Sequence, residues 1–295
     1  MPLFGNQAYG SNRGGGMKWI IAAIIAGIGL ITYLRSGQVN PTTGEKQHVA
    51  MSVDQEKSLG LQAAPKMAAE MGGAADPARE PDARLVQEIG LKLVKATEAF
   101  KSPYRDSFDF HLLNDAKTVN AFALPGGQIF ITRALFNRLE NEAQLAGVLG
   151  HEMGHVINRH SAEHMAKGQL GQMLAAAAGV ATSDRGSGGA MAAQMVNQMM
   201  QLKYSRADEL EADNYGLRYM NEAAYDPRQM LRVMEILKQA SGASGRGPDI
   251  LATHPDPDAR IAAIQQWLST NSAKLPRTLT PGRTLHNSSD RFTPR

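Results

Sequence analysis

The sequence contains no cysteine among its 295 residues. Disulfide bonds, a thiol nucleophile and an anchor built on a lipid-modified cysteine are therefore excluded. A strong charge of either sign is also missing, because 31 lysines and arginines oppose 28 aspartates and glutamates. No nucleic-acid-binding motif is visible, and the small net charge of +3 does not favour such a partner. We therefore predict that the protein binds no nucleic acid.

Internal repeats are absent too, so the sequence gives no indication of a helical-repeat module. Residues 51–270 are enough for one domain with its own core. The stretch that follows, residues 271–295, is rich in proline, serine and threonine and has five basic residues against one acidic residue. It lacks hydrophobic periodicity, and we predict a disordered basic tail.

One long apolar stretch, residues 19–34, carries no charged side chain. As a helix it spans about 24 Å, slightly short of a typical hydrocarbon core, and Trp19 and Tyr33 flank it as interfacial anchors. A cleaved signal peptide, which would leave a secreted protein, is the alternative, but residues 34–37 offer no small-x-small cleavage site. We therefore expect an N-terminal tail, a single-pass membrane anchor and a polar linker, at residues 1–16, 17–35 and 36–50.

Basic residues on the two sides of this stretch determine its expected orientation. Arg13, Lys18 and the terminal amine precede it, whereas Arg35 and Lys46 follow it. Positive charge favours the cytoplasmic side, and the balance tips slightly towards an N-terminus inside the cell. The main domain is then expected to face the periplasm or the cell exterior.

His151, Glu152 and His155 form an HExxH motif within a predicted helix at residues 142–165. Residues four apart lie one above the other on a helix, so the two imidazoles can bind the same metal ion. Glu152 lies beside them, within reach of a water on that metal. Zinc peptidases use this arrangement, with the glutamate as general base.

A catalytic zinc needs a third protein ligand and an open position for water. The later segment that contains Glu209 and Glu211 is the obvious source. On a helix Glu209 shares its face with small residues and Asp213, whereas Glu211 shares a solvated face. The small residues allow an approach to Gly150 and Gly154 of the motif helix. We predict one zinc ion per chain, and the predicted ligands are His151, His155 and Glu209. Asp213 is predicted to orient a ligand imidazole.

Two further histidines, His160 and His164, follow the motif. In an unbroken helix both point away from the face that carries His151 and His155. We therefore expect them to be polar helix residues rather than ligands.

The order of these motifs resembles that of a family of zinc metallopeptidases, which includes the CAAX prenyl protease and the heat-shock membrane peptidase HtpX. The resemblance covers roughly residues 52–268. It rests on HExxH, Ser205-Arg206-x-x-Glu209-x-Glu211-Ala212-Asp213, residues 120–131 and Thr253-His254-Pro255. It implies that Glu209 is the third zinc ligand. It also implies that His254 lies at the active site, where it stabilises the transition state or occupies the open zinc position at rest.

The resemblance also implies a strand-turn-strand before the motif helix. Peptidases commonly bind substrate in extended form along a strand edge, and our candidate for this edge is Asn120, Ala121, Phe122 and Ala123. The turn at residues 124–127 could equally close a plain hairpin.

A further helix is predicted to begin at Asp256 and Pro257, which suit the N-cap and first helical positions. Arg260 on this helix either pairs with a carboxylate such as Asp213 or is solvated. If the resemblance does not extend to His254, that histidine is a loop residue before the helix.

The rest of the pattern is mostly helical. We predict helices at residues 82–100 and 222–239, the second broken by Pro227, and a strand at 108–113. Ser52 and Gln55 resemble a capping box that opens a helix. These elements predict an α+β, mostly helical, zincin-like metallopeptidase domain with a small antiparallel sheet.

Two stretches are less regular. Residues 63–81, rich in alanine, glycine and proline, are predicted to be loosely structured. Residues 165–202, rich in methionine, predict two helices joined by a glycine-rich loop, either a helical hairpin in the core or a lid.

The expected function is that of a membrane-anchored zinc endopeptidase in the quality control of envelope proteins, with unfolded or misfolded proteins as substrates. The alternative from another class is a membrane-tethered holdase or adaptor that keeps a zinc-stabilised fold without turnover. A protease of prenylated substrates is less favoured, because one spanning segment cannot build an intramembrane chamber. The pattern indicates no oligomeric state.

Overall fold

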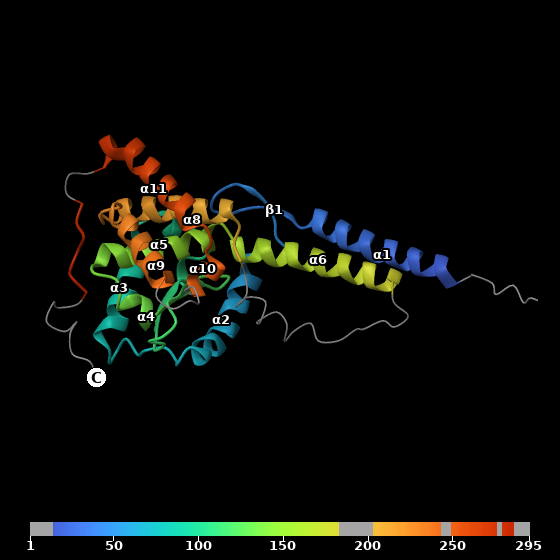
Figure 1. Cartoon of the computed structure of the whole chain (residues 1–295), viewed down its shortest axis with the longest axis horizontal. Coiled ribbons are helices and arrows are strands. Elements are labelled where there is room, and N and C mark those ends of the chain that lie inside the picture. The colour runs from blue at the N-terminus through green and yellow to red at the C-terminus, as the bar shows by residue number, and fades with distance from the viewer. Residues whose placement is uncertain (1–13, 183–202, 243–248, 276–278, 286–295) are drawn as a thin grey trace, which may run out of the picture.

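The computed structural model of this chain describes residues 14–182, 203–242, 249–275 and 279–285. Figure 1 shows a body of helices around a small sheet, from which α1 and α6 project. The strands are β1 (Gly37–Val39), β2 (Lys46–His48), β3 (Asp109–Leu113), β4 (Ala121–Ala123) and β5 (Gln128–Thr132). The helices are α1 (Gly14–Arg35), α2 (Val53–Glu70), α3 (Pro81–Ala96), α4 (Arg133–Phe136), α5 (Glu142–Ile157), α6 (His160–Thr182), α8 (Arg206–Glu222), α9 (Gln229–Gly242), α10 (Asp249–Thr253) and α11 (Pro257–Asn271), with short 3-10 turns at Glu98–Lys101, Arg105–Ser107 and Ser272–Lys274.

The larger sheet has three strands in the order β3-β5-β4. β4 and β5 form the expected antiparallel hairpin, in which Phe122 lies opposite Phe130. The neighbour of β3 is β5 rather than β4. The two strands pair in parallel, with Phe110 opposite Ile129. The sheet is therefore mixed rather than antiparallel throughout. The predicted fold class, a mostly helical α+β domain, is confirmed.

The motif helix α5 is buried along its whole length. It packs against α3, α8, α9 and the strands β4 and β5. Leu145, Leu149 and Met153 are fully buried in this core, and each such side chain contributes about 1.5–3 kcal/mol by leaving water. Hydrophobic burial therefore carries the polar residues of the motif into the interior.

Several predicted elements are confirmed. The Ser52 side chain accepts from the backbone N–H of Gln55 and the Gln55 side chain accepts from that of Ser52, which completes the capping box of α2. Asp256 caps α11 by accepting from the backbone N–H of Ala259. The helix predicted at residues 222–239 begins only after Pro227, as α9 at Gln229, because Glu222 belongs to the end of α8.

Helix α2 is longer than the sequence suggested. It continues to Glu70, into the stretch predicted to be loosely structured. The reason is packing, because Ala63 and Met67 are buried in a cluster with Leu124 and Phe130 of the hairpin.

The predicted continuous helix at residues 142–165 is wrong, because it breaks at Arg159. This residue has a φ of 58°, which costs an L-residue backbone strain, and α6 starts immediately after it. The buried Arg159 guanidinium donates to Glu56 (2.8 Å), to the backbone oxygen of Met51 (2.8 Å) and to Gln38 (3.2 Å). These partners lie more than a hundred residues away in the chain, so helical periodicity could not reveal the break.

The predicted linker contains an antiparallel hairpin of β1 and β2. The side-chain amide of Asn40 donates to the carbonyl oxygen of Ile157 (2.9 Å), and that of Gln47 donates to the carbonyl oxygen of Asn158. Carbonyl groups at a helix C-terminus have no partner within the helix. The hairpin therefore caps the motif helix and ties it to the end of α1.

Part of the predicted disordered tail lies on the domain. The backbone N–H groups of Glu142 and Ala143 donate to the carbonyl oxygens of Arg283 and Pro281, and the Arg283 guanidinium pairs with the Glu142 carboxylate. Residues 279–285 are thus ordered and cap the N-terminal end of α5. The other residues of the tail beyond 275 lie outside the described part of the chain.

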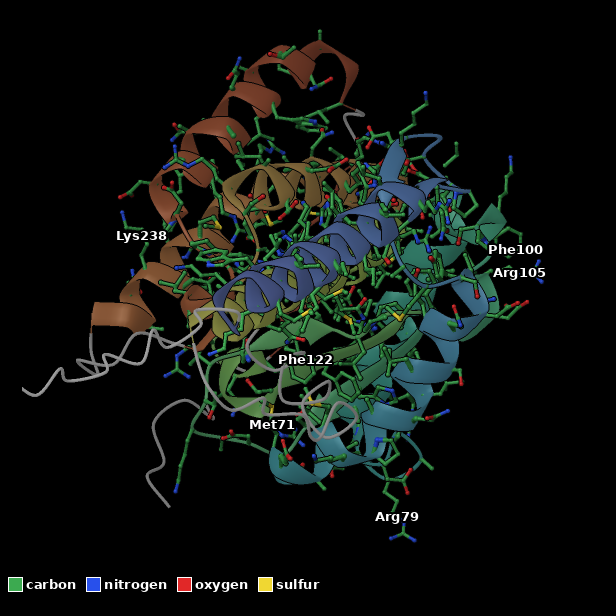
Figure 2. All side chains as sticks on the ribbon, turned by 90° about the vertical axis from the view of Figure 1, so that its right-hand side faces the viewer. Met71, Arg79, Phe100, Arg105, Phe122 and Lys238 are labelled. Atoms are coloured by element: carbon green, nitrogen blue, oxygen red, sulfur yellow. The ribbon has the colours of Figure 1, made fainter. Side chains whose placement is uncertain are left out.

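Helix α1 corresponds to the predicted anchor. The segment Gly16–Arg35 is long and apolar enough to cross a membrane, and only 11% of its apolar window is buried. One N-terminal helix of this kind fits a single-pass membrane anchor. Figure 2, viewed from the side on which α1 projects, shows α1 lying in front of α6.

The first helix predicted in residues 165–202 lies within α6, which runs along α1. Residues 183–202, where the second helix and the glycine-rich loop were expected, lie outside the described residues.

Removal of the Glu56 carboxylate would leave the Arg159 guanidinium buried without its counter-charge. We expect Glu56→Ala to lower the free energy of unfolding by about 3–5 kcal/mol. Urea unfolding of the full chain in mild detergent, followed by circular dichroism, measures this loss. Glu70→Ala removes only an exposed pair with Lys66 and should cost less than about 1 kcal/mol. Equal losses in the two variants would contradict the role of the buried pair.

Candidate metal centre

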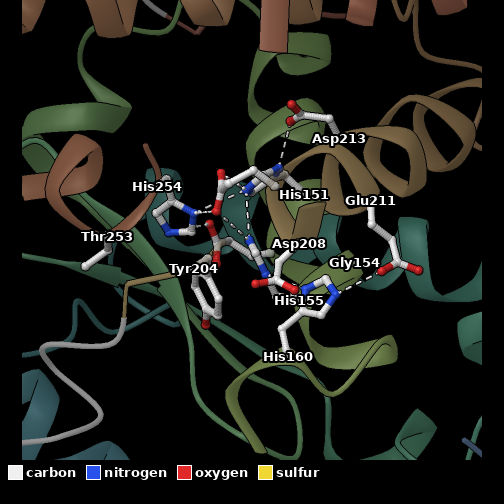
Figure 3. A network of polar contacts seen from close by, with 12 residues as sticks. His151, Gly154, His155, His160, Tyr204, Asp208, Glu211, Asp213, Thr253 and His254 are labelled. Atoms are coloured by element: carbon white, nitrogen blue, oxygen red, sulfur yellow. Dashed lines mark hydrogen bonds and ion pairs between the residues drawn. The ribbon is translucent and has the colours of Figure 1, made fainter. Parts of the chain in front are cut away.

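Four buried side chains each bring one ligand atom to within 4.8 Å of the others: His151, His155, Glu209 and His254. Figure 3 shows His151 and His155 of α5 facing His254, which precedes α11; Glu209 comes from α8. Nε2 of His151 lies 3.1 Å from Nε2 of His155 and 3.3 Å from Nδ1 of His254. Oε1 of Glu209 lies 3.0 Å from Nδ1 of His254 and 3.5 Å from Nε2 of His155.

These spacings allow a test of whether the residues suit zinc. Zinc in proteins is commonly tetrahedral, and bonds of about 2.0–2.1 Å place the ligand atoms of a tetrahedron roughly 3.3 Å apart. The four separations given above, 3.0–3.5 Å, bracket that value. Imidazole nitrogen and carboxylate oxygen are also ligands that zinc prefers. The four side chains therefore fit a zinc ion.

The close approach of α5 and α8 brings the two halves of this group together. A Cβ atom placed on Gly154 would lie 3.0 Å from Cα of Ala212, and one on Gly150 would lie 3.3 Å from Cα of Gly216. Because both α5 positions are glycine, the backbone of α8 can lie directly on the motif helix. The predicted contact through small residues is confirmed, and it places Glu209 beside the two histidines.

Asp213 and Arg260 lie behind the ligand group. Oδ1 of Asp213 is 2.9 Å from Nδ1 of His151, as the prediction of an orienting carboxylate requires. Arg260 is buried and donates to both carboxylate oxygens of Asp213, at 2.6 and 2.7 Å. Its Nη1 also lies 2.8 Å from Oε2 of Glu209. Of the two interpretations of Arg260, ion pairing therefore holds.

Buried carboxylates are normally hard to ionise, but this cluster overcomes that cost. Burial alone would raise the pKa of Glu209, yet the charge of His254, hydrogen bonds from the histidines and the charge of Arg260 hold it well below its usual range. Against the same effect of burial, the charge and hydrogen bonds of Arg260 lower the pKa of Asp213 to about 2. Both groups are thus negative at neutral pH and suited to a cation.

His160 does not point away from the site, and the prediction that it does is wrong. Because the helix breaks at Arg159, α6 starts in a new direction and its first residue, His160, faces His155. Nδ1 of His160 lies 2.8 Å from Nδ1 of His155. On its other side, Nε2 of His160 lies 3.2 Å from Oε2 of Glu211. Glu211 is half-buried rather than fully solvated. His164, by contrast, pairs with Asp208.

Sequence reasoning also missed Tyr204. Its ring stacks on the His155 imidazole with 3.9 Å between centroids, and its hydroxyl lies 2.8 Å from Oγ of Ser161. Its backbone N–H donates to the carbonyl oxygen of Thr253, next to His254. The available signal was an aromatic residue directly before the residue that caps α8.

Glu152 lies beside the ligand group without being part of it. Its Oε1 is 3.8 Å from Nε2 of His254, and its Oε2 has no hydrogen-bond partner within the described residues. Burial raises the pKa of this carboxyl. A buried carboxylate with an unpaired oxygen beside a metal site is suited to proton transfer.

A small cavity of about 20 Å³ adjoins Glu152 and His254. Most of its other lining residues are apolar and come largely from α9: Val148, Met230, Val233, Met234, Leu237 and Ile250. Its volume suits about one water molecule rather than a side chain.

The predicted substrate strand is an edge strand of the sheet, and its residues Ala121 and Ala123 are buried. β4 is the last strand in the order β3-β5-β4, and Asn120 and Leu124 bond to β5 at either end of it. Backbone groups alternate in direction along an antiparallel strand, so the N–H and C=O groups of Ala121 and Ala123 point away from β5.

Comparisons with known proteins add an independent finding. The sequence profile of Peptidase family M48 matches residues 80–268. "Mitochondrial metalloendopeptidase OMA1" of Schizosaccharomyces pombe is 30% identical over 257 residues, which cover 87% of this chain and 74% of that protein. "Beta-barrel assembly-enhancing protease" of Escherichia coli K12 is 30% identical over 254 residues, 82% of this chain. The chain spans 50% of the length of this second relative.

The matched region contains the HExxH helix, the Glu209 helix and His254, so the comparisons and the geometry concern the same residues. The expected resemblance and the expected zinc metallopeptidase class are both confirmed. The chain belongs to peptidase family M48.

Proposed function

We propose that this chain is a membrane-anchored zinc endopeptidase that cleaves unfolded or misfolded proteins. The observation that carries the proposal is the convergence of four buried ligand atoms at the spacing of a tetrahedral zinc site. In this proposal His151, His155 and Glu209 hold the metal. Bound zinc would polarise a peptide carbonyl group and lower the pKa of water to about 7.

The neighbours of the two histidines define which ring nitrogen faces the metal. If Nε2 of His151 binds zinc, its Nδ1–H donates to Asp213 at 2.9 Å. In the same way, Nδ1–H of His155 donates to Nδ1 of His160, whose Nε2–H then donates to Glu211. Such partners fix the tautomer and orientation of a ligand imidazole and strengthen its binding to the metal.

Glu152 is the proposed general base. Its position beside the ligand group leaves its carboxylate free to accept a proton from the attacking water. Burial raises its pKa, which makes it a better base than an exposed carboxylate. It then returns the proton to the amine that leaves.

His254 has two roles in this proposal. Its Nδ1 lies among the ligand atoms, which supports a resting form in which the imidazole occupies the position that water needs. Once displaced, the same side chain is close enough to Glu152 to donate a hydrogen bond to the developing oxyanion.

The edge strand β4 is the proposed binding strand for substrate. Because Ala121 and Ala123 are buried, the segments that cover β4 would have to move before the outward-facing backbone groups pair with an extended peptide through main-chain hydrogen bonds, which require no particular sequence. Extended segments with exposed apolar residues are typical of unfolded proteins.

We place this activity outside the cytoplasm, in the quality control of envelope proteins. The exposed apolar face of α1 supports membrane attachment, and Arg13 and Lys18 support an N-terminus inside. The name of one relative, "Beta-barrel assembly-enhancing protease", supports this assignment.

Glu152→Gln separates the endopeptidase from a holdase. The change leaves the ligand group intact, so we expect bound zinc to stay near one per chain while casein cleavage falls by at least about a hundredfold. Zinc content and cleavage are measured on the same preparation. Undiminished cleavage would remove Glu152 as the base, and a wild-type chain that binds zinc but never cleaves casein would favour the holdase.

The two glutamates of α8 should differ in their effect on zinc. Glu211 acts only through His160, so Glu211→Ala should weaken zinc binding by about tenfold, as loss of an outer partner does. Glu209→Ala removes a ligand and should weaken it by more than about a hundredfold. Titration against a competing chelator measures both affinities. Equal losses, or a larger loss at Glu211, would contradict the ligand assignment.

His254→Ala frees the water position but removes the oxyanion donor, so we expect kcat on a peptide substrate to fall by about ten- to a thousandfold with little change in KM. His164→Ala is the matched control, since His164 pairs with Asp208 outside the ligand group. A kcat above that of the wild type would instead indicate that His254 acts only by occupying the water position.

A further inference from the structure

Helix α6 links the metal centre to the membrane anchor. It begins at His160, which contacts His155, and then runs beside α1 away from the domain (Figure 1). The contact is close, because a Cβ atom placed on Gly29 of α1 would lie 3.0 Å from Cβ of Met173 and 3.6 Å from the side chain of Leu170. A glycine at this position allows close helix packing, as between helices in membranes.

The register of the two helices aligns their uncharged stretches. α1 ends at the domain and α6 begins there, so they run antiparallel, with Gly29 level with Met173. Six residues from this level towards the domain lie Arg35 on α1 and Lys167 on α6. Beyond these basic residues both sequences are uncharged for sixteen residues, at positions 19–34 and 168–183.

The outer surfaces of the two helices are apolar at the same level. Ile28 of α1 is 53% exposed, and Leu174 of α6, which lies level with it, is 47% exposed. Ala175 and Ala176 next to Leu174 are exposed as well. The two glutamines of this part of α6, Gln169 and Gln172, lie in its portion nearest the domain.

The exposed apolar side chains of α1 and α6 would be unfavourable in water. If α6 served to shield α1 from water, most of the large side chains of α1 would be covered. Instead Trp19, Ile20 and Ile24 are more than half exposed although α6 packs alongside. An apolar surface of this extent, continuous over two helices, needs a further apolar partner.

We propose that α6, from Gly168 onward, enters the same bilayer as α1, so that the two helices form an antiparallel pair in contact with lipid acyl chains. This inference rests on the proposed role of α1 as a membrane anchor. Among the described residues α1 is the helix that is apolar enough to cross a membrane by itself, and α6 therefore depends on packing against α1 to insert.

The arrangement sets the height of the metal centre above the membrane. Lys167 and Arg35 mark the bilayer boundary, and His160 lies seven residues before Lys167 on α6. At 1.5 Å per residue this separation is about 10 Å. The ligand group is thus held close to the membrane surface by a helix that contacts it.

Fluorescence quenching in liposomes tests the proposal. The chain has no cysteine, so Leu174→Cys, Ile28→Cys and Leu61→Cys each provide one labelling site for an environment-sensitive dye. Leu61 is the control, because it is exposed on α2 in the domain. The full-length variants are reconstituted in phosphatidylcholine and phosphatidylglycerol vesicles, with and without a lipid that carries a nitroxide on its acyl chain.

We expect the label at Leu174 to be quenched to the same extent as the label at Ile28, whereas the label at Leu61 is unaffected. Quenching at Ile28 with none at Leu174 would overturn the insertion of α6 and leave the anchor in place. No quenching at either position would overturn both.

Casein cleavage by each labelled variant reports separately on the peptidase and on folding. Ala175→Cys, also exposed on α6, replaces Leu174→Cys if that variant is inactive, and the same outcomes apply to it.

Discussion

The metal centre depends on the direct contact between α5 and α8. Glycines at positions 150 and 154 leave no side chain between the two helices, and the backbone of α8 at Ala212 and Gly216 takes that space. Two distant segments hold the ends of α5: the β1-β2 hairpin caps its C-terminus and residues 279–285 cap its N-terminus. The position of the histidines is therefore fixed by the helix termini as well as by the core.

Electrostatics in the interior follows from this packing. Two carboxylates, Glu209 and Asp213, are buried next to each other, and Arg260 lies between them as their shared counter-charge. Without Arg260 their repulsion and loss of hydration would favour protonation, and a protonated Glu209 would be a poor ligand. Because the four ligand atoms already lie within 4.8 Å of one another, with four of their separations at 3.0–3.5 Å, metal binding requires little rearrangement and should also stabilise the fold.

The sequence predicted the parts of the site that depend on helical periodicity. The four-residue spacing of His151 and His155 and the small-residue face of Glu209 follow from one helix at a time. The contact of His160 with His155 was not predicted, because it depends on the break at Arg159. That break is held by Glu56 and other partners far away in the chain. The parallel pairing of β3 with β5 was missed for a similar reason, since strand alternation does not reveal which strands are neighbours.

X-ray absorption at the zinc edge tests the central claim most directly, namely that these four side chains form one zinc site. The measurement compares the zinc-loaded full chain with its His254→Ala variant. We predict four nitrogen or oxygen neighbours at about 2.0–2.1 Å, with the signal of three imidazoles in the wild type and of two in the variant. A six-coordinate oxygen shell, or an imidazole signal that does not change in the variant, would contradict this account.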